Sequence, residues 1–184
     1  MPSIEFKKIY RQDDSTFLSI LNNIRNGVVD YNDLYILNQR TNMTLPENDM
    51  VITLCSINKT ADNINNVRLD AIKEPSYLFE GTIVKDFDKK KVPVSKELIL
   101  KKGAQVMFCR NDPQQRWANG TLGKITQIDE ENIFVTIENG EEYKVDKVSW
   151  EATSYEYNSE KKKVVKTITG SYSQYPLKLA WAIT

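Results

Sequence analysis

Histidine is absent from the 184 residues, and cysteine occurs only at Cys55 and Cys109. Structural zinc sites draw on four Cys or His ligands, so this composition excludes a site of that kind and predicts no metal centre. Both cysteines lie inside apolar, strand-like runs, which indicates two reduced thiols in the core of a cytoplasmic protein.

Long apolar runs are also missing. No segment approaches the roughly 20 apolar residues that a membrane-spanning helix needs, and the N-terminus lacks the apolar core of an export signal. The composition, with 40% hydrophobic and 27% charged residues, is that of an ordinary soluble globular protein. It predicts one large or two small domains without a membrane partner.

A nucleotide-binding phosphate cradle is a third absence. None of the seven glycines fits the spacing G-x-x-x-x-G-K-[ST], and the segment from Gly120 to Lys124 is two residues short of it. The chain also shows no nucleophile–base pair and no convincing carboxylate dyad. We therefore expect the polypeptide alone not to hydrolyse ATP and to hold no cofactor by itself.

The chain has no excess of positive or negative charge, because it contains 25 basic and 25 acidic residues. The two kinds of residue are, however, unevenly distributed along the sequence. Residues 85–124 contain ten Lys or Arg and four Asp or Glu, whereas residues 129–160 contain two and ten. This asymmetry predicts a basic face and an acidic face, the alternative being charge runs that are merely solvated.

The first part of the chain alternates strand and helix patterns. A short strand is expected at residues 4–9, followed by a helix that Asp13, Asp14 and Ser15 cap and Gly27 ends. Asp30 is the expected N-cap of a second helix. An almost unbroken apolar strand at residues 50–55, suited to the interior of a parallel sheet, leads into a helix capped by residues 56–58.

The second part reads as closely spaced short strands. The turn at Asn139-Gly140 is the strongest hairpin signal, and a second hairpin is expected between residues 150–157 and 164–172. Tyr155, Tyr157 and Tyr172 form an aromatic face in one interpretation; cross-strand packing in a small barrel explains them more simply.

Residues 98–125 contain a turn at Gly103, a compact apolar strand, and a polar loop that carries Arg116 and Trp117. Two interpretations of the loop remain open. It lies against a sugar-phosphate backbone with a base stacked on the indole, or it is a surface loop whose Trp117 folds back as a plug. The chemistry of the loop alone favours the plug.

The segments KGAQVMFCRND and NGTLGKI resemble RecD-like superfamily 1 DNA helicases, particularly the petite-integration-frequency branch. The opening order of a strand, YRQ and two helices, the segment SINKTADNIN and the final run to Thr184 resemble the same family. The resemblance implies an α/β fold: a partial RecA-like second motor domain with an inserted Src-homology-3-like small β-barrel. The motor part would cover residues 1–84 and 174–184, a linker 85–97 and the barrel 98–173.

The resemblance also implies site residues. Arg11, in an aromatic-Arg-Gln motif with Gln12, would reach the γ-phosphate of ATP, a role suited to a planar, always charged guanidinium; the alternative is a surface arginine paired with Asp13 or Asp14. Asn58 would hold a phosphate at a strand-to-helix junction, while Asn65 is expected to tie its helix to a loop. The expected nucleic-acid contacts are Asn58, Arg110, Asn111, Arg116, Trp117, Asn119, Gly120, Thr121, Lys124 and Thr184.

The function implied is the C-terminal portion of an ATP-dependent 5′–3′ DNA helicase that lacks its first motor domain. Its expected partners are single-stranded DNA and that missing domain, with ATP and Mg²⁺ bound in the full-length protein, and the chain is expected to be a monomer. The alternative is a non-catalytic module that binds nucleic acid or protein through a small β-barrel.

Overall fold

A computed structural model describes residues 4, 13–44, 50–88, 92–158 and 162–184. The chain divides into two compact units, Met1–Glu47 and Asn48–Thr184, which are described separately. The strand expected at residues 4–9 lies outside the described residues, apart from Ile4. Among the helices of the described residues, none has the length and hydropathy of a membrane-spanning segment.

The described residues of the first unit form two capped helices, α1 (Ser15–Asn26) and α2 (Tyr31–Asn38). A carboxylate oxygen of Asp14 accepts the amide of Phe17 at 3.0 Å, and Gly27 ends α1 at φ +69°, a conformation that glycine adopts without strain. Asp30 and Asp33 form a reciprocal capping box at the start of α2. In this unit the caps predicted at Asp14, Gly27 and Asp30 are confirmed.

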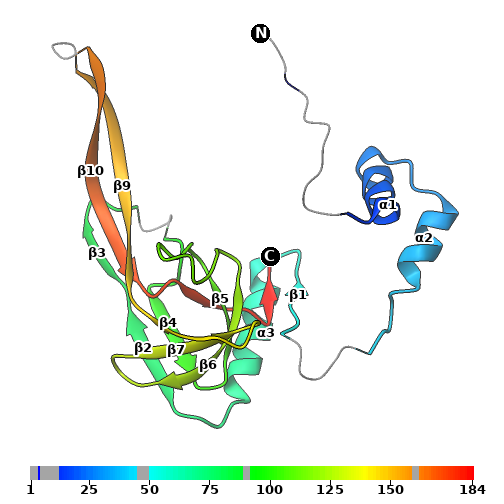
Figure 1. Cartoon of the computed structure of the whole chain (residues 1–184), viewed down its shortest axis with the longest axis horizontal. Helices are drawn as coiled ribbons and strands as arrows, with labels where there is room; N and C mark the ends of the chain where they lie inside the picture. Colours follow the sequence, from blue (N-terminus) through cyan, green and yellow to red (C-terminus); the bar gives the residue numbers. More distant parts are fainter. Residues whose placement is uncertain (1–3, 5–12, 45–49, 89–91, 159–161) are drawn as a thin grey trace. The chain divides into compact units, whose positions relative to one another are not determined.

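In its described residues, the second unit contains one helix and a set of strands, of which β9 and β10 are long (Figure 1). Its helix is α3 (Asn58–Asp70). The strands are β1 (Thr53–Leu54), β2 (Ser76–Glu80), β3 (Thr82–Lys85), β4 (Glu97–Lys101), β5 (Gln105–Phe108), β6 (Leu122–Ile128), β7 (Ile133–Ile137), β8 (Glu142–Val145), β9 (Val148–Asn158), β10 (Lys163–Gln174), β11 (Leu177–Leu179) and β12 (Ala182–Ile183).

The largest sheet is antiparallel, with the order β11-β5-β6-β7-β8. The hairpin predicted at Asn139-Gly140 joins β7 to β8, with Gly140 at φ +86°. The predicted closed barrel is not seen: among the described residues, β8 and β11 remain the two edges of an open sheet. β9 and β10, which lie in the predicted barrel segment, do not join this sheet. β9 pairs with β10, and β10 pairs with β3.

A single hydrophobic core joins the large sheet to its neighbours. Phe108, Ile125 and Val135 of the sheet cluster with Leu100 of β4 and Leu69 of α3. Burying each such side chain contributes about 1.5–3 kcal/mol, so this core fixes the sheet, the β2–β4 pair and α3 to one another. The loops around the large sheet are therefore carried by a packed support.

The end of the chain connects two sheets. β11 forms an edge of the large sheet, whereas β12 pairs in parallel with β1. Of the parallel strand predicted at residues 50–55, only Thr53–Leu54 forms, and the predicted burial is wrong, because Leu54 is 79% exposed. In the described residues β1 pairs with β12 alone, so it forms part of a two-stranded sheet and not the interior strand that was expected.

Candidate nucleic-acid interface

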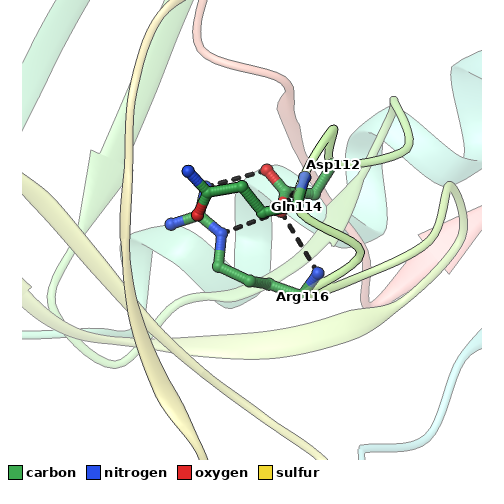
Figure 2. Close-up of polar contacts among 3 residues, drawn as sticks. All are labelled: Asp112, Gln114 and Arg116. Carbon is green, nitrogen blue, oxygen red and sulfur yellow. Dashed lines mark hydrogen bonds and ion pairs between the residues drawn. The ribbon is translucent and has the colours of Figure 1, made fainter.

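Asp112 organises the loop between β5 and β6. Its carboxylate accepts hydrogen bonds from the backbone amides of Gln114 and Arg116 at 3.0 and 3.1 Å. It also accepts two bonds from the Arg116 guanidinium, Nε and Nη2, each at 2.8 Å (Figure 2). The Asp112 side chain is only 3% exposed. A forked ion pair with two extra backbone donors fixes the shape of the loop.

The hydrogen bonds from Arg116 hold the pKa of Asp112 at about 2, below its ordinary 3.8. The folded state therefore binds this proton more weakly than the unfolded chain. The resulting stabilisation is full above pH 4 or so and is lost as the pH falls through about 2. Arg116 is thus already neutralised by a partner within the loop, which reduces what it can offer to a phosphate.

Replacing Asp112 with asparagine is expected to lower the free energy of unfolding at pH 7 by about 2–3 kcal/mol. The change removes the negative charge and leaves the partly buried guanidinium of Arg116 without a counter-charge. Urea unfolding at pH 7 and at pH 3 measures it, with the exposed Asp62→Asn as control. The difference from the wild type should shrink at pH 3, and a difference that is the same at both values would contradict the role of this carboxylate.

Trp117 is buried, with 7% of its surface exposed. Its ring is stacked on Phe108 at a centroid distance of 4.3 Å, and the Arg116 guanidinium lies 4.4 Å from its centre. Tyr143 packs beside it at 5.7 Å. A base therefore has no free access to the indole, and the arrangement is the plug that the loop chemistry favoured.

The remaining loop residues divide into structural and exposed ones. Asn111 accepts the amide of Asn119 at 2.7 Å, and Thr121 accepts the amide of Ala118 through its hydroxyl at 3.1 Å. Arg110 donates to the backbone carbonyl of Ser149. Gly120 has φ +93°, and its backbone N–H donates to the backbone carbonyl of Phe108 at 2.8 Å.

Among the predicted contacts of this loop region, the exposed side chains are Asn111, Asn119 and Lys124, beside the exposed backbone of Gly120. The Asn111 side chain is already bonded to the amide of Asn119, which leaves Asn119, Gly120 and Lys124. These three are the positions of the loop region that a nucleic-acid backbone reaches without displacing a structural contact.

Asn58 and Thr184 lie together at a second place. The hydroxyl of Thr184 donates to the side-chain oxygen of Asn58 at 2.6 Å. Asn58 is the first residue of α3, and its N-cap, Ile57, makes no side-chain cap, contrary to the cap expected from residues 56–58. Both residues border a cavity of about 850 Å³ between α3, β4 and the end of the chain. No hydrogen bond of the described residues joins this pair to the β5–β6 loop.

Buried amide side chains, two of them not anticipated from the sequence, hold these parts in place. As expected, Asn65 ties its helix to a neighbouring segment: it pairs with both the N–H and the C=O of Ala182, each at 2.9 Å. Gln105 donates to the carbonyls of Val51 and Ala180, and the fully buried Gln174 donates to that of Phe79. Their partners lie far away in the sequence, so no local signal pointed to them.

Arg11 and Gln12, the predicted nucleotide contacts, lie outside the described residues. Their assignment therefore rests on the sequence pattern alone.

Comparison with known proteins identifies the relationship. Residues 89–128 match the family described as "DNA helicase Pif1, 2B domain". The ATP-dependent DNA helicase Pif1 of Bdellovibrio bacteriovorus is 33% identical over 179 residues, 95% of this chain and 38% of the relative. The chain is a Pif1 relative. The resemblance found in the sequence is confirmed.

Solved Pif1 structures extend the similarity to the fold. Bacteroides sp Pif1 in complex with ADP-AlF4 matches with a TM-score of 0.84 at 31% identity, over 96% of this chain and 41% of that one. Bacteroides Pif1 bound to ssDNA matches with a TM-score of 0.69 over the same shares of the two chains. The chain thus spans about two fifths of the length of these three Pif1 chains.

Proposed function

We propose that this chain supplies the C-terminal part of an ATP-dependent DNA helicase that moves 5′ to 3′ along single-stranded DNA. The observation that carries the proposal is the 33% identity, over 95% of the chain, to a protein named ATP-dependent DNA helicase Pif1. The fold match to Bacteroides Pif1 structures with ADP-AlF4 and with ssDNA supports it. We further propose a cytoplasmic location and a monomeric state.

In fold terms, we infer that β1, α3 and β12 belong to a RecA-like second motor domain. A parallel strand pair with a helix joined to it through Asn65 is the unit from which such domains are built. The segment that matches the 2B domain would be the insertion, related to a Src-homology-3-like barrel although its sheet is open here.

The nucleotide side of the proposal rests on Arg11. The described residues contain no group of acidic side chains that could hold a metal ion, and the sequence has no phosphate cradle. ATP and Mg²⁺ would therefore be held by another motor domain. Arg11, assisted by Gln12, would complete that site by pairing its guanidinium with the γ-phosphate, and the chain alone would not turn ATP over.

The DNA side of the proposal involves two groups of residues. Asn58 and Thr184 lie at the start of α3, where the helix dipole and backbone amides without a side-chain cap favour a phosphate. Asn119, Gly120 and Lys124 are exposed at the β5–β6 loop and would follow the sugar-phosphate backbone. Arg110, Asn111, Arg116, Trp117 and Thr121 would contribute by holding that loop in shape.

A chimera tests the function. In the Bdellovibrio relative, the matched 38% is replaced by this chain, and ssDNA-stimulated ATP hydrolysis and unwinding of a duplex with a 5′ tail are measured. We expect both activities in the chimera and neither in the isolated chain. A folded chimera that binds single-stranded DNA but neither hydrolyses ATP nor unwinds DNA would favour the non-catalytic binding module instead.

A further inference from the structure

The strands β9 and β10 form a long ribbon that projects from the rest of the second unit (Figure 1). Near its base, Tyr172 is fully buried and stacked on Trp150 at a centroid distance of 5.8 Å. Beyond Gly170 a register shift lets the ribbon continue past β3, which pairs only with the base. The outer half of the ribbon therefore has no third strand beside it among the described residues.

One side of this outer half carries aromatic and aliphatic side chains. Tyr157 lies opposite Val164, Tyr155 opposite Lys166, and Thr153 opposite Ile168, so these residues share one side of the ribbon. We call Tyr155, Tyr157, Val164, Lys166 and Ile168 the ribbon face. Both tyrosines are about two-thirds exposed, at 66% and 64%, and the two aliphatic side chains are more than half exposed.

The ribbon face is not an extension of the core. Along β9, side chains alternate between the two sides, so Tyr155 and Tyr157 point away from the side on which Trp150 packs. Of the preferred sequence interpretation, the cross-strand packing holds for Tyr172, which stacks on Trp150, although in an open sheet and not in a barrel. It is wrong for Tyr155 and Tyr157, which are exposed. Exposed tyrosines on a projecting ribbon need an explanation other than fold stability.

The chemistry of the ribbon face favours unpaired nucleic-acid bases. Two rings spaced two residues apart along one strand offer consecutive stacking surfaces, and Lys166 lies directly across from one of them. No acidic side chain lies on this side of the described outer ribbon, since Glu156 alternates to the other side. Aromatic platforms with a neighbouring cation bind single strands with little sequence preference.

We propose that the ribbon face is a stacking site for single-stranded DNA, with Tyr155 and Tyr157 holding bases and Lys166 pairing with a phosphate. The inference rests on the proposed function and adds a contact surface outside both residue groups assigned to DNA above. It requires no change in the fold, because all three side chains are already exposed.

Fluorescence anisotropy of a labelled 20-mer of thymidine with the 184-residue chain tests the site. The double change Tyr155→Ala and Tyr157→Ala should weaken binding at least about tenfold. Tyr155→Phe with Tyr157→Phe should stay within about twofold of the wild type, because the rings remain. Lys166→Gln should reduce the slope of log affinity against log salt by about 0.7.

Two controls make the result specific. Glu156→Gln with Thr167→Ala alters the other side of the ribbon and should leave affinity unchanged within about twofold. An abasic 20-mer should bind the wild type and the double alanine variant equally, because it has no bases to stack. Unaltered affinity of the double alanine variant for the thymidine 20-mer would overturn the ribbon site and leave the face to a protein partner. If the wild type binds neither oligonucleotide, the proposed DNA role of the whole chain fails as well.

Discussion

Trp117→Ala is expected to lower the free energy of unfolding by about 3–5 kcal/mol, the cost of removing a large ring from a close-packed core. The indole is 7% exposed and is stacked on Phe108, with Arg116 and Tyr143 around it. Its loss leaves a cavity and removes the surface on which the Arg116 guanidinium rests. Urea unfolding followed by circular dichroism measures the change.

Comparing Trp117→Ala with Trp117→Phe distinguishes a buried aromatic plug from a platform on which a base stacks. Trp117→Phe keeps an aromatic plug and should cost roughly 1–3 kcal/mol, with single-stranded DNA affinity preserved. A base platform would behave differently, because Trp117→Ala would then weaken DNA binding while costing less than about 1 kcal/mol of stability. That second outcome would contradict the buried position of the ring.

Local chemistry made part of the fold predictable from the sequence. Asp14, Gly27 and Asp30 cap helices because their side-chain oxygens or their backbone freedom suit those positions in any context. Asn139-Gly140 makes its hairpin for the same reason. In each case the residues that decide the structure are within four positions of one another.

The roles of Asp112 and Gln174 could not be predicted, because they depend on tertiary contacts. Asp112 carries no local signal of its role, which depends on Arg116 lying over the Trp117 ring, and that ring is itself stacked on Phe108. Gln174 meets the carbonyl of Phe79, 95 positions away, and its polar side chain gives no sign of complete burial. Such contacts depend on tertiary packing that a local pattern does not contain.

The β9–β10 ribbon shows that a strand can be predicted from the sequence without its buried side being known. The strand predicted at residues 150–157 is present in β9, yet the sequence pattern does not say which side of it is covered. Tyr172 lies where the core reaches the ribbon, and Tyr155 lies beyond it, although both are aromatic residues in paired strands. The open large sheet has the same origin, since the predicted strands exist but pair with different neighbours from those of a closed barrel.

Arg11→Ala is expected to lower the kcat for ATP hydrolysis of the chimera about a thousandfold, the lower end of the range for an arginine that stabilises phosphoryl transfer. The guanidinium would meet charge that develops on the γ-phosphate, so its loss should reduce kcat more than it weakens ATP binding. Steady-state ATP hydrolysis at saturating single-stranded DNA measures this effect.

Two further variants test whether the loss of kcat is due to the planar guanidinium of Arg11. Arg11→Lys keeps the positive charge but cannot make two parallel bonds to phosphate oxygens, so it should recover only part of the lost rate. Arg25→Ala removes another arginine, in the last turn of α1, and should leave the rate unchanged. If Arg11→Ala hydrolyses ATP as fast as the parent chimera, Arg11 does not contact the γ-phosphate, and the alternative of a surface arginine paired with Asp13 or Asp14 becomes the better account. Arg11→Ala should also keep the affinity for single-stranded DNA, because its proposed partner is the nucleotide.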